Sequence, residues 1–433
     1  MRKFVCFFIL VISFLALHSN AEAHSGGWEI TKPAGRALQG YTNTQSYEKG
    51  QAITFYIHND KPYHIDFYRM GYNSGKGAAY LGSMNQSYGV SANKQPRGEV
   101  RSAGWKPSAY YKVPLSWKSG VYIAKLTDTD RRQSHITFVV RDHAPKAQLG
   151  VMIATNTYQA YNAWGGKSLY NFNSANGEKA GTVSFNRPSF EAGGAGQFFR
   201  SEYQFIRWIE RQNYTVTYFS DRDVHNGLLA KSSIRALVIP GHNEYWTRNM
   251  WSNIEKFGRT RGIALLSANT GYREVSYRKD APYLMDLKGE FRSSTIKLPE
   301  NKIFGTMFTG VPAKVYNDLP IVADHPLLKG TGLKKGSVIP KIIGGEVDGI
   351  RGHGFATPKG VEVIGEKRMA FKGTSELRNS NLIWFKKPEG GRVFAVGTFY
   401  WNWQLDSYGK ESEVKTHNGV QALTRNALNA LIK

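Results

Sequence analysis

The chain has 433 residues, of which 41% are hydrophobic, and it carries a formal net charge of +24 with one cysteine, Cys6. This length and apolar content exclude a disordered tail protein and a small disulfide scaffold, and they allow more than one domain. The basic residues are spread in short clusters such as Arg131-Arg132, so the charge favours an anionic surface in general and does not mark one site.

The first 23 residues have the pattern of a secretory signal peptide. Arg2 and Lys3 precede an apolar run over residues 4–17, and small residues mark a cleavage site after Ala23. We therefore expect a periplasmic or secreted protein. Because Cys6 lies in this segment, the mature chain would contain no cysteine, which excludes a thiol nucleophile, a Cys-zinc site and a redox dithiol.

Export and positive charge limit the expected partners. An anionic envelope surface fits both features, whereas export argues against nucleic acid as a partner. Cleavage after Ala23 would also leave His24 at the N-terminus, where its amine and imidazole, together with His58 or His64, could bind copper. Nothing else in the sequence supports that alternative.

Residues 24–142 have the pattern of an all-β domain. Apolar and polar residues alternate over residues 53–57, and short runs that favour strands follow. The runs lie at residues 63–68, 121–126 and 136–140. Several short strands separated by turns predict an antiparallel, immunoglobulin-like sandwich, and residues 141–145 are typical of a linker.

Residues 146–433 alternate between apolar strands and amphipathic helices. The expected strands lie at residues 149–154, 216–219, 236–240, 263–267 and 393–396. The expected helices lie at residues 203–212, around 250–257 and around 420–431. This alternation predicts an α/β domain with a mainly parallel sheet.

Polar loops that follow three of the expected strands are candidates for a functional site. Residues 155–166, 241–246 and 267–272 are dense in Tyr, Trp, His and Asn, and ligands bind beyond the carboxyl ends of parallel strands. His242 and Glu244 follow a buried strand directly and are the strongest candidates. The aromatic residues there could instead only cover the sheet edge.

Other motifs are weaker or missing. Residues 221–225 contain two Asp and one His, but their place between a strand and a helix favours helix capping over metal binding. The chain has no His-Glu-x-x-His and no Gly-x-Ser-x-Gly, so the signatures of zinc peptidases and serine hydrolases are lacking.

Nine short motifs occur in an order and spacing that resemble the catalytic domain of the N,N-dimethylformamidase large (beta) subunit family. They are residues 157–166, 185–188, 207–210, 241–246, 267–270, 324–326, 331–333, 345–348 and 397–403. Residues 67–77 resemble the β-sandwich that precedes that domain, so the likeness extends from about residue 40 to 406. It implies a glutamine-amidotransferase-like sheet, without the nucleophilic cysteine of those enzymes.

The resemblance implies an amidohydrolase with one ferric ion. By motif, its ligands would be Tyr161, Tyr203 and Glu244. Phenolates and a carboxylate are hard oxygen donors that suit Fe³⁺, which can act as a Lewis acid.

Three further residues receive catalytic roles by the same resemblance. His242 would transfer or orient a proton, Asn269 would stabilise a carbonyl, and Glu346 would be the general base.

The expected reaction is the hydrolysis of a non-peptide C–N amide bond in a small amide or glycan-amide substrate. Asn243 stands where the family commonly has Asp, and Ala268 where it often has Gly, which leaves the substrate open. The family also implies a possible small partner subunit or a homo-oligomer. The alternative is a non-catalytic glycan- or cell-surface-binding protein that retains the fold and uses its aromatic residues for stacking.

Overall fold

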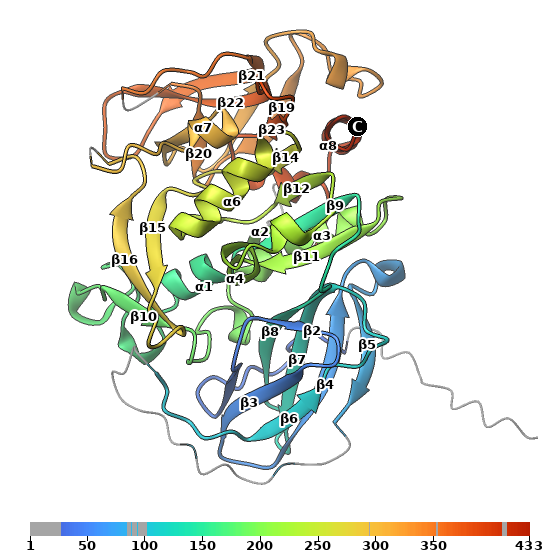
Figure 1. The fold of residues 1–433 in the computed structure, drawn as a ribbon, viewed down its shortest axis with the longest axis vertical. Coiled ribbons are helices and arrows are strands. Elements are labelled where there is room, and N and C mark those ends of the chain that lie inside the picture. The colour runs from blue at the N-terminus through green and yellow to red at the C-terminus, as the bar shows by residue number, and fades with distance from the viewer. Residues whose placement is uncertain are drawn as a thin grey trace, which may run out of the picture.

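The computed structural model describes residues 27–84, 88, 93, 102–293, 295–351, 354–408 and 414–433 (Figure 1). The expected signal peptide with Cys6, and His24 behind it, lie outside these residues. No helix in the described ranges is long and apolar enough to cross a membrane. Of the two other histidines considered for copper binding, His58 bonds the carbonyl of Asn93 and His64 pairs with Asp66.

Two sheets form the N-terminal part of the molecule, drawn in blue to teal in Figure 1. The smaller has the order β1 (Leu38–Thr42), β3 (Ala52–Asn59), β6 (Ala109–Lys112). The larger has the order β2 (Ser46–Glu48), β8 (Gln133–Arg141), β7 (Gly120–Asp128), β4 (Tyr63–Met70), β5 (Ala78–Ser83). The strands predicted at residues 53–57, 63–68, 121–126 and 136–140 are thereby confirmed.

The five-stranded sheet is buried on both faces. On β7, Tyr122 and Ala124 pack into the core between the two N-terminal sheets, while Val121 and Ile123 join a core that also contains Val151 of β9 (Leu149–Ile153). Alternate residues of a strand point to opposite faces, which explains why β7 is an almost unbroken buried run. The N-terminal sheets are thus packed firmly against the remainder of the chain.

A seven-stranded mixed sheet forms the centre of the C-terminal part. Its order is β11 (Val216–Ser220), β9, β12 (Ala236–Ile239), β14 (Gly262–Leu265), β23 (Arg392–Ala395), β22 (Leu377–Lys386), β21 (Val361–Ala370). The first five strands are parallel, and β22 and β21 continue the sheet antiparallel.

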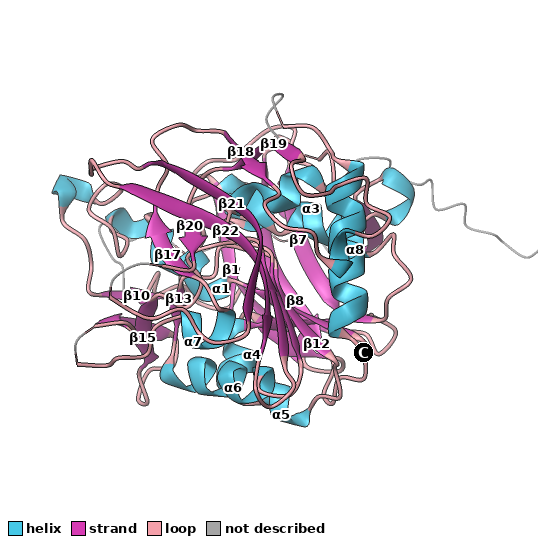
Figure 2. Cartoon of the chain, turned by 90° about the horizontal axis from the view of Figure 1, so that it is seen from above, coloured by secondary structure: helices cyan, strands magenta, loops and turns pink. Residues whose placement is uncertain are grey.

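Short helices cover both faces of this sheet. α4 (Asp221–His225), α5 (Leu228–Lys231), α6 (Arg248–Gly258) and α7 (Asn301–Phe304) pack on one face, and α3 (Tyr203–Ile209) and α8 (Asn418–Leu431) on the other (Figure 2). α1 (Thr155–Tyr161) and α2 (Phe198–Ser201) complete the α-helices of the described residues. The helices predicted around residues 203–212, 250–257 and 420–431 are confirmed.

Smaller sheets and 3-10 turns account for most of the remaining chain. One sheet has the order β10 (Thr182–Ser184), β16 (Leu284–Glu290), β15 (Arg273–Tyr277), β13 (Tyr245–Trp246). Two pairs join β17 (Met307–Gly310) to β20 (Val347–Gly349) and β18 (Asn317–Pro320) to β19 (Val338–Ile343). The 3-10 turns are η1 (Asn73–Gly75), η2 (Trp164–Gly166), η3 (Ala175–Gly177), η4 (Ala192–Gly194), η5 (Pro326–Leu328) and η6 (Phe399–Gln404).

The predicted fold class is wrong. The molecule is not a mainly parallel, glutamine-amidotransferase-like α/β domain behind an immunoglobulin-like sandwich. It is mostly β, with 35% strand and 20% helix, and its sheets are of several kinds. The error has a physical origin, because the predicted strands and helices come from clear apolar patterns, whereas β15–β22 contain many polar and half-buried residues that carry no strong period.

Candidate functional site

The candidate site lies where the parallel strands end. α1 begins just after β9, the segment 241–246 follows β12, and Asn269 lies in the loop after β14. Glu346 comes from a different source, the turn between β19 and β20. These four segments meet at the rim of the sheet, which therefore brings together polar side chains from distant parts of the sequence.

Two tyrosine hydroxyls converge on one carboxylate oxygen. The Tyr170 hydroxyl donates to Glu244 Oε2 at 2.6 Å, and the Tyr161 hydroxyl donates to the same oxygen at 3.1 Å. The two rings lie with their centroids 4.3 Å apart. Burial and the charge of Glu244 raise the pKa of both phenols well above the usual value, so both carry protons in the absence of a cation.

The His242 ring lies between two carboxylates. Its Nε2 is 3.4 Å from Glu244 Oε2 and 3.3 Å from Glu346 Oε2, which are ion-pair distances without good hydrogen-bond geometry. The ring also packs against Phe399, with centroids 4.5 Å apart. Burial alone would lower the pKa of His242, but the charges of Glu346 and Glu244 outweigh it and raise the pKa to about 9.

Glu244 is almost completely buried and remains ionised because of its neighbours. Burial favours the neutral acid, but His242, the Tyr170 hydroxyl and Arg273 together lower the pKa of Glu244 below its usual value. Arg273 Nε lies 3.5 Å from Glu244 Oε1. The backbone N–H of Glu244 donates to the Thr157 hydroxyl at 3.0 Å, which fixes this residue to α1.

Asn269 also contacts Glu346. Its Nδ2 donates to Glu346 Oε2 at 2.7 Å, and its backbone N–H donates to Asp348 Oδ1 at 2.8 Å. Asn269 has a left-handed backbone with φ 50°, a conformation that costs energy in most residues other than glycine. The bond to Asp348, whose pKa burial raises to about 8, helps to maintain it.

A buried arginine organises the segment that carries both tyrosines. All five N–H groups of Arg187 donate to backbone carbonyls, and no carboxylate of the described residues pairs with it. The acceptors are the carbonyls of Gln159, Asn162, Trp164, Lys167 and Ser184, at 2.7 to 3.2 Å. Four of these residues flank Tyr161 or lead to Tyr170, so Arg187 fixes the path of the chain between the two rings.

The structure brings together five of the six residues that the sequence nominated, namely Tyr161, His242, Glu244, Asn269 and Glu346. Tyr203 is elsewhere. On α3 it is fully buried, and its hydroxyl donates to the carbonyl of Gly77 at 2.6 Å. Its ring packs among Trp28, Phe199 and Tyr408.

Tyr170 is the residue that sequence reasoning missed. After α1 the chain turns back through Gly165 and Gly166, whose φ angles of 78° and 97° suit glycine. This reversal returns Tyr170 to the side of Tyr161. The Gly-Gly pair after a helix that carries a tyrosine was the one feature of the sequence that could have indicated this chain reversal.

Asn243 has a structural explanation for its departure from the family's usual Asp. Its Nδ2 donates to Asp221 Oδ1 at 2.9 Å, and its Oδ1 accepts from the Trp246 indole at 2.8 Å. An Asp here would place a second carboxyl against Asp221, whose pKa burial already raises to about 7. The capping interpretation of residues 221–225 is confirmed, since Ser220 and Asp223 form a capping box on α4.

Across the part of the chain that the structure describes, no three His, Cys, Asp or Glu side chains gather as a metal-binding group. The oxygens that meet at this rim are those of Tyr161, Tyr170 and Glu244.

Comparison with known families identifies the class of protein that carries this site. Residues 64–417 match the family described as N,N-dimethylformamidase beta subunit-like, C-terminal. The chain belongs to this family, and its membership indicates an N,N-dimethylformamidase-like hydrolase function.

The other comparisons add little. No curated protein matches the chain. Among solved structures, murine CEACAM1b is similar at 13% identity over 26% of this chain, with a TM-score of 0.14. A Paenibacillus cycloisomaltooligosaccharide glucanotransferase complexed with cycloisomaltoheptaose is similar at 10% identity over 58% of this chain and 33% of its own, with a TM-score of 0.17. This chain spans 61% of the CEACAM1b chain, and TM-scores this low establish no shared fold.

Proposed function

We propose that this protein hydrolyses a non-peptide C–N bond of an amide, with a ferric ion bound by Tyr161, Tyr170 and Glu244. The observation that carries the proposal is the convergence of two phenol oxygens on Glu244 Oε2, at 2.6 and 3.1 Å. Membership of the N,N-dimethylformamidase beta subunit-like family supports the reaction class.

The chemistry of the three side chains fits Fe³⁺. Two phenolates and one carboxylate supply three anionic, hard oxygen donors, which balance the charge of the ion. Without a cation, the two phenol protons occupy the space between these oxygens and the Glu244 carboxylate. When bound, the ion would polarise an amide carbonyl and lower the pKa of water.

Glu346 is placed to accept the proton of the attacking water. Its side chain is 19% exposed, so water reaches it, whereas Glu244 is enclosed. Asn269 Nδ2 and His242 Nε2 both approach Glu346 Oε2, so the carboxylate is held in one orientation. A base fixed in this way reacts without first reorganising.

In the proposed hydrolysis, Glu346 and His242 move the protons. The water oxygen bonds to the amide carbon while Glu346 takes one water proton. The C–N bond then breaks, and the leaving nitrogen receives a proton that His242 holds at Nε2 between the two carboxylates. Glu346 then returns its proton to His242, so the products are a carboxylic acid and an amine, and no other reactant is consumed.

An exposed aromatic ring beside the site suggests a substrate with an apolar substituent. Phe172 is 75% exposed, and its ring centroid lies 5.2 Å from that of Tyr170 and 6.4 Å from that of Tyr161. An aromatic side chain kept in water next to a polar site gains energy by covering apolar groups of a ligand. We therefore favour small amides with N-alkyl or similar apolar groups.

Metal analysis and a visible absorption spectrum test the proposal. Protein reconstituted with Fe³⁺ should hold about one iron per chain, show the broad charge-transfer band of iron-bound tyrosinate, and release amine from N,N-dimethylformamide or a related small amide. Glu244→Ala should lose iron, band and activity.

Glu346→Gln is the matched control, because Glu346 is the second carboxylate on His242 and is outside the proposed ligand set. This variant should keep iron and band and lose activity. Iron retained in Glu244→Ala would overturn the ligand set. A colourless wild-type protein after reconstitution would favour a non-catalytic binding function.

A further inference from the structure

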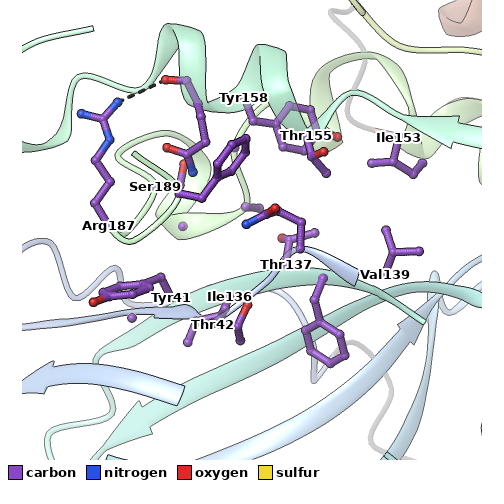
Figure 3. A pocket seen from close by; sticks show the side chains of 18 residues that line it. Tyr41, Thr42, Ile136, Thr137, Val139, Ile153, Thr155, Tyr158, Arg187 and Ser189 are labelled. Carbon is purple, nitrogen blue, oxygen red and sulfur yellow. Dashed lines mark hydrogen bonds between the residues drawn. The ribbon is translucent and has the colours of Figure 1, made fainter. Parts of the chain in front are cut away.

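A cavity lies between the N-terminal sheets and the segments that carry the candidate site (Figure 3). β1 and β8 form one side, and α1 with residues 185–196 forms the other. The cavity offers about 70 Å³ to the centres of water-sized molecules, and neither His242 nor Glu244 lines it. One water needs roughly 10–15 Å³ on this measure, so the space suits a molecule of the size of roughly five waters.

Four hydroxyl groups in the cavity wall are buried, and three of them have no partner among the described residues, whereas the fourth, Thr155 Oγ1, interacts with Asp221. The three are Thr137 Oγ1 of β8, Tyr158 OH of α1 and Ser189 Oγ. They come from three separate segments, and Figure 3 shows them around the same space. An unpaired buried polar group costs about 1–3 kcal/mol, so three of them around one cavity indicate a hydrogen-bonding occupant.

The charge of the wall selects a neutral occupant. Arg187 is the one charged side chain among the lining residues, and its five N–H groups are all used by backbone carbonyls. Among the described residues, no carboxylate, lysine or histidine lines the cavity, although the chain as a whole carries a net charge of +24. Hydroxyl groups both donate and accept, which matches a ligand that does the same.

Apolar surface lies between these hydroxyls. Tyr41, Ile136, Val139 and Phe185 line the same space and can pack against C–H groups. We propose that this cavity binds a small neutral polyol, a molecule with hydroxyl groups on neighbouring carbons and about the size of glycerol. The proposal concerns a site separate from the proposed iron site and does not depend on the proposed function.

Saturation-transfer NMR with glycerol tests this proposal on the full chain, prepared in glycerol-free buffer. The double variant Thr137→Val/Ser189→Ala removes two hydroxyls with almost no change in shape. We expect glycerol to bind the wild type at millimolar concentration and the double variant about tenfold more weakly, the effect of one or two lost hydrogen bonds.

The matched control removes the same kinds of hydroxyl outside the cavity, in Thr295→Val/Ser293→Ala. It should bind glycerol as the wild type does, and added sulfate should not compete. Tyr158→Phe, which keeps the ring that packs on Gly196, should weaken binding as well. Equal signals from wild type and double variant, or no signal from the wild type, would overturn the proposal and leave a cavity filled with water only.

Discussion

Two tyrosine clusters in this protein are similar in composition but differ in the partners of their hydroxyl groups. Around Tyr203, the hydroxyl donates to the Gly77 carbonyl, and Arg207 pairs with Asp406 at 2.8 Å. Around Tyr161 and Tyr170, two hydroxyls share one carboxylate oxygen, and a histidine stands between that carboxylate and a second one.

The difference lies in the acceptor. A phenol that donates to a backbone carbonyl has a satisfied hydrogen bond, and the neutral carbonyl does not attract a cation to replace the proton. Two phenols that donate to a buried carboxylate form a set of three oxygens that a cation can take over by displacing protons. The partner of a tyrosine is therefore more informative about function than its burial or its aromatic surroundings.

Arg187→Lys should have the largest effect, and it should act on the Tyr161–Tyr170 cluster alone. Lysine has three donors where arginine has five, so at least two buried carbonyls lose their partner, and the free energy of unfolding should fall by about 4 kcal/mol. Urea denaturation measures this. The charge-transfer band of the folded, iron-loaded variant should shift or broaden, because the path between the two rings changes; an unchanged band would show that Arg187 only stabilises the fold.

Asp406→Ala should break the Tyr203 cluster with a smaller loss. Asp406 is buried and pairs with Arg207 at 2.8 Å and Arg211 at 2.7 Å, so its removal leaves a buried guanidinium without a counter-charge. The expected loss is about 3 kcal/mol of unfolding free energy. The band of the folded, iron-loaded protein should stay as in the wild type, and loss of the band would mean that the clusters are coupled.

Glu202 lies between the clusters, next to Tyr203 in the chain and packed against Gly241 beside His242. Burial raises its pKa from 4.5 to about 8. A raised pKa means that the folded state holds the proton more tightly, so stability from this group is full below pH 4.5 and is lost as the pH rises through 8.

Glu202→Gln should remove this pH dependence. Between pH 5 and 9 the variant should gain on the order of 4 kcal/mol relative to the wild type, measured by denaturation at each pH. The sign of this change in stability decides between the two protonation states of Glu202. A variant that loses stability relative to the wild type as the pH rises would show that Glu202 is ionised in the folded protein.

Phe172→Ser should have the smallest effect, and only on substrate binding. Removing an exposed ring beside the tyrosines should raise KM for N-alkyl amides several-fold, about 1 kcal/mol, with kcat nearly unchanged. Phe190→Ser is the control, since that ring is also exposed, at 60%, but makes no ring contact with the site tyrosines among the described residues. Equal KM changes in both variants would remove Phe172 from the substrate site.

Some parts of this molecule were accessible from the sequence. β9, β12 and β14 are short apolar runs followed by polar loops, so both the strands and the place of His242 and Glu244 could be predicted. The approach of Glu346 to His242 could not be predicted from periodicity, because it depends on the turn between β19 and β20, and came only from resemblance to the family.

The missed parts depend on chain reversals and on mixed burial. Tyr170 joins the site only because Gly165 and Gly166 turn the chain back after α1. The hairpin of β21 and β22 extends the central sheet with strands whose residues are partly exposed, so their sequence shows no regular alternation. These strands were therefore not predicted, and the chain was wrongly assigned to the α/β class. Local patterns gave individual elements, and long-range pairing decided the architecture.

The assignment of Tyr170, and not Tyr203, as an iron ligand is tested by comparing Tyr170→Phe with Tyr203→Phe in iron-reconstituted protein. Each change removes one hydroxyl from a buried ring. We expect Tyr170→Phe to lose most of the tyrosinate-to-iron band and to bind iron more weakly, while Tyr203→Phe keeps both and loses only about 1 kcal/mol of stability with its bond to Gly77. Loss of the band in Tyr203→Phe, with the band intact in Tyr170→Phe, would contradict this assignment.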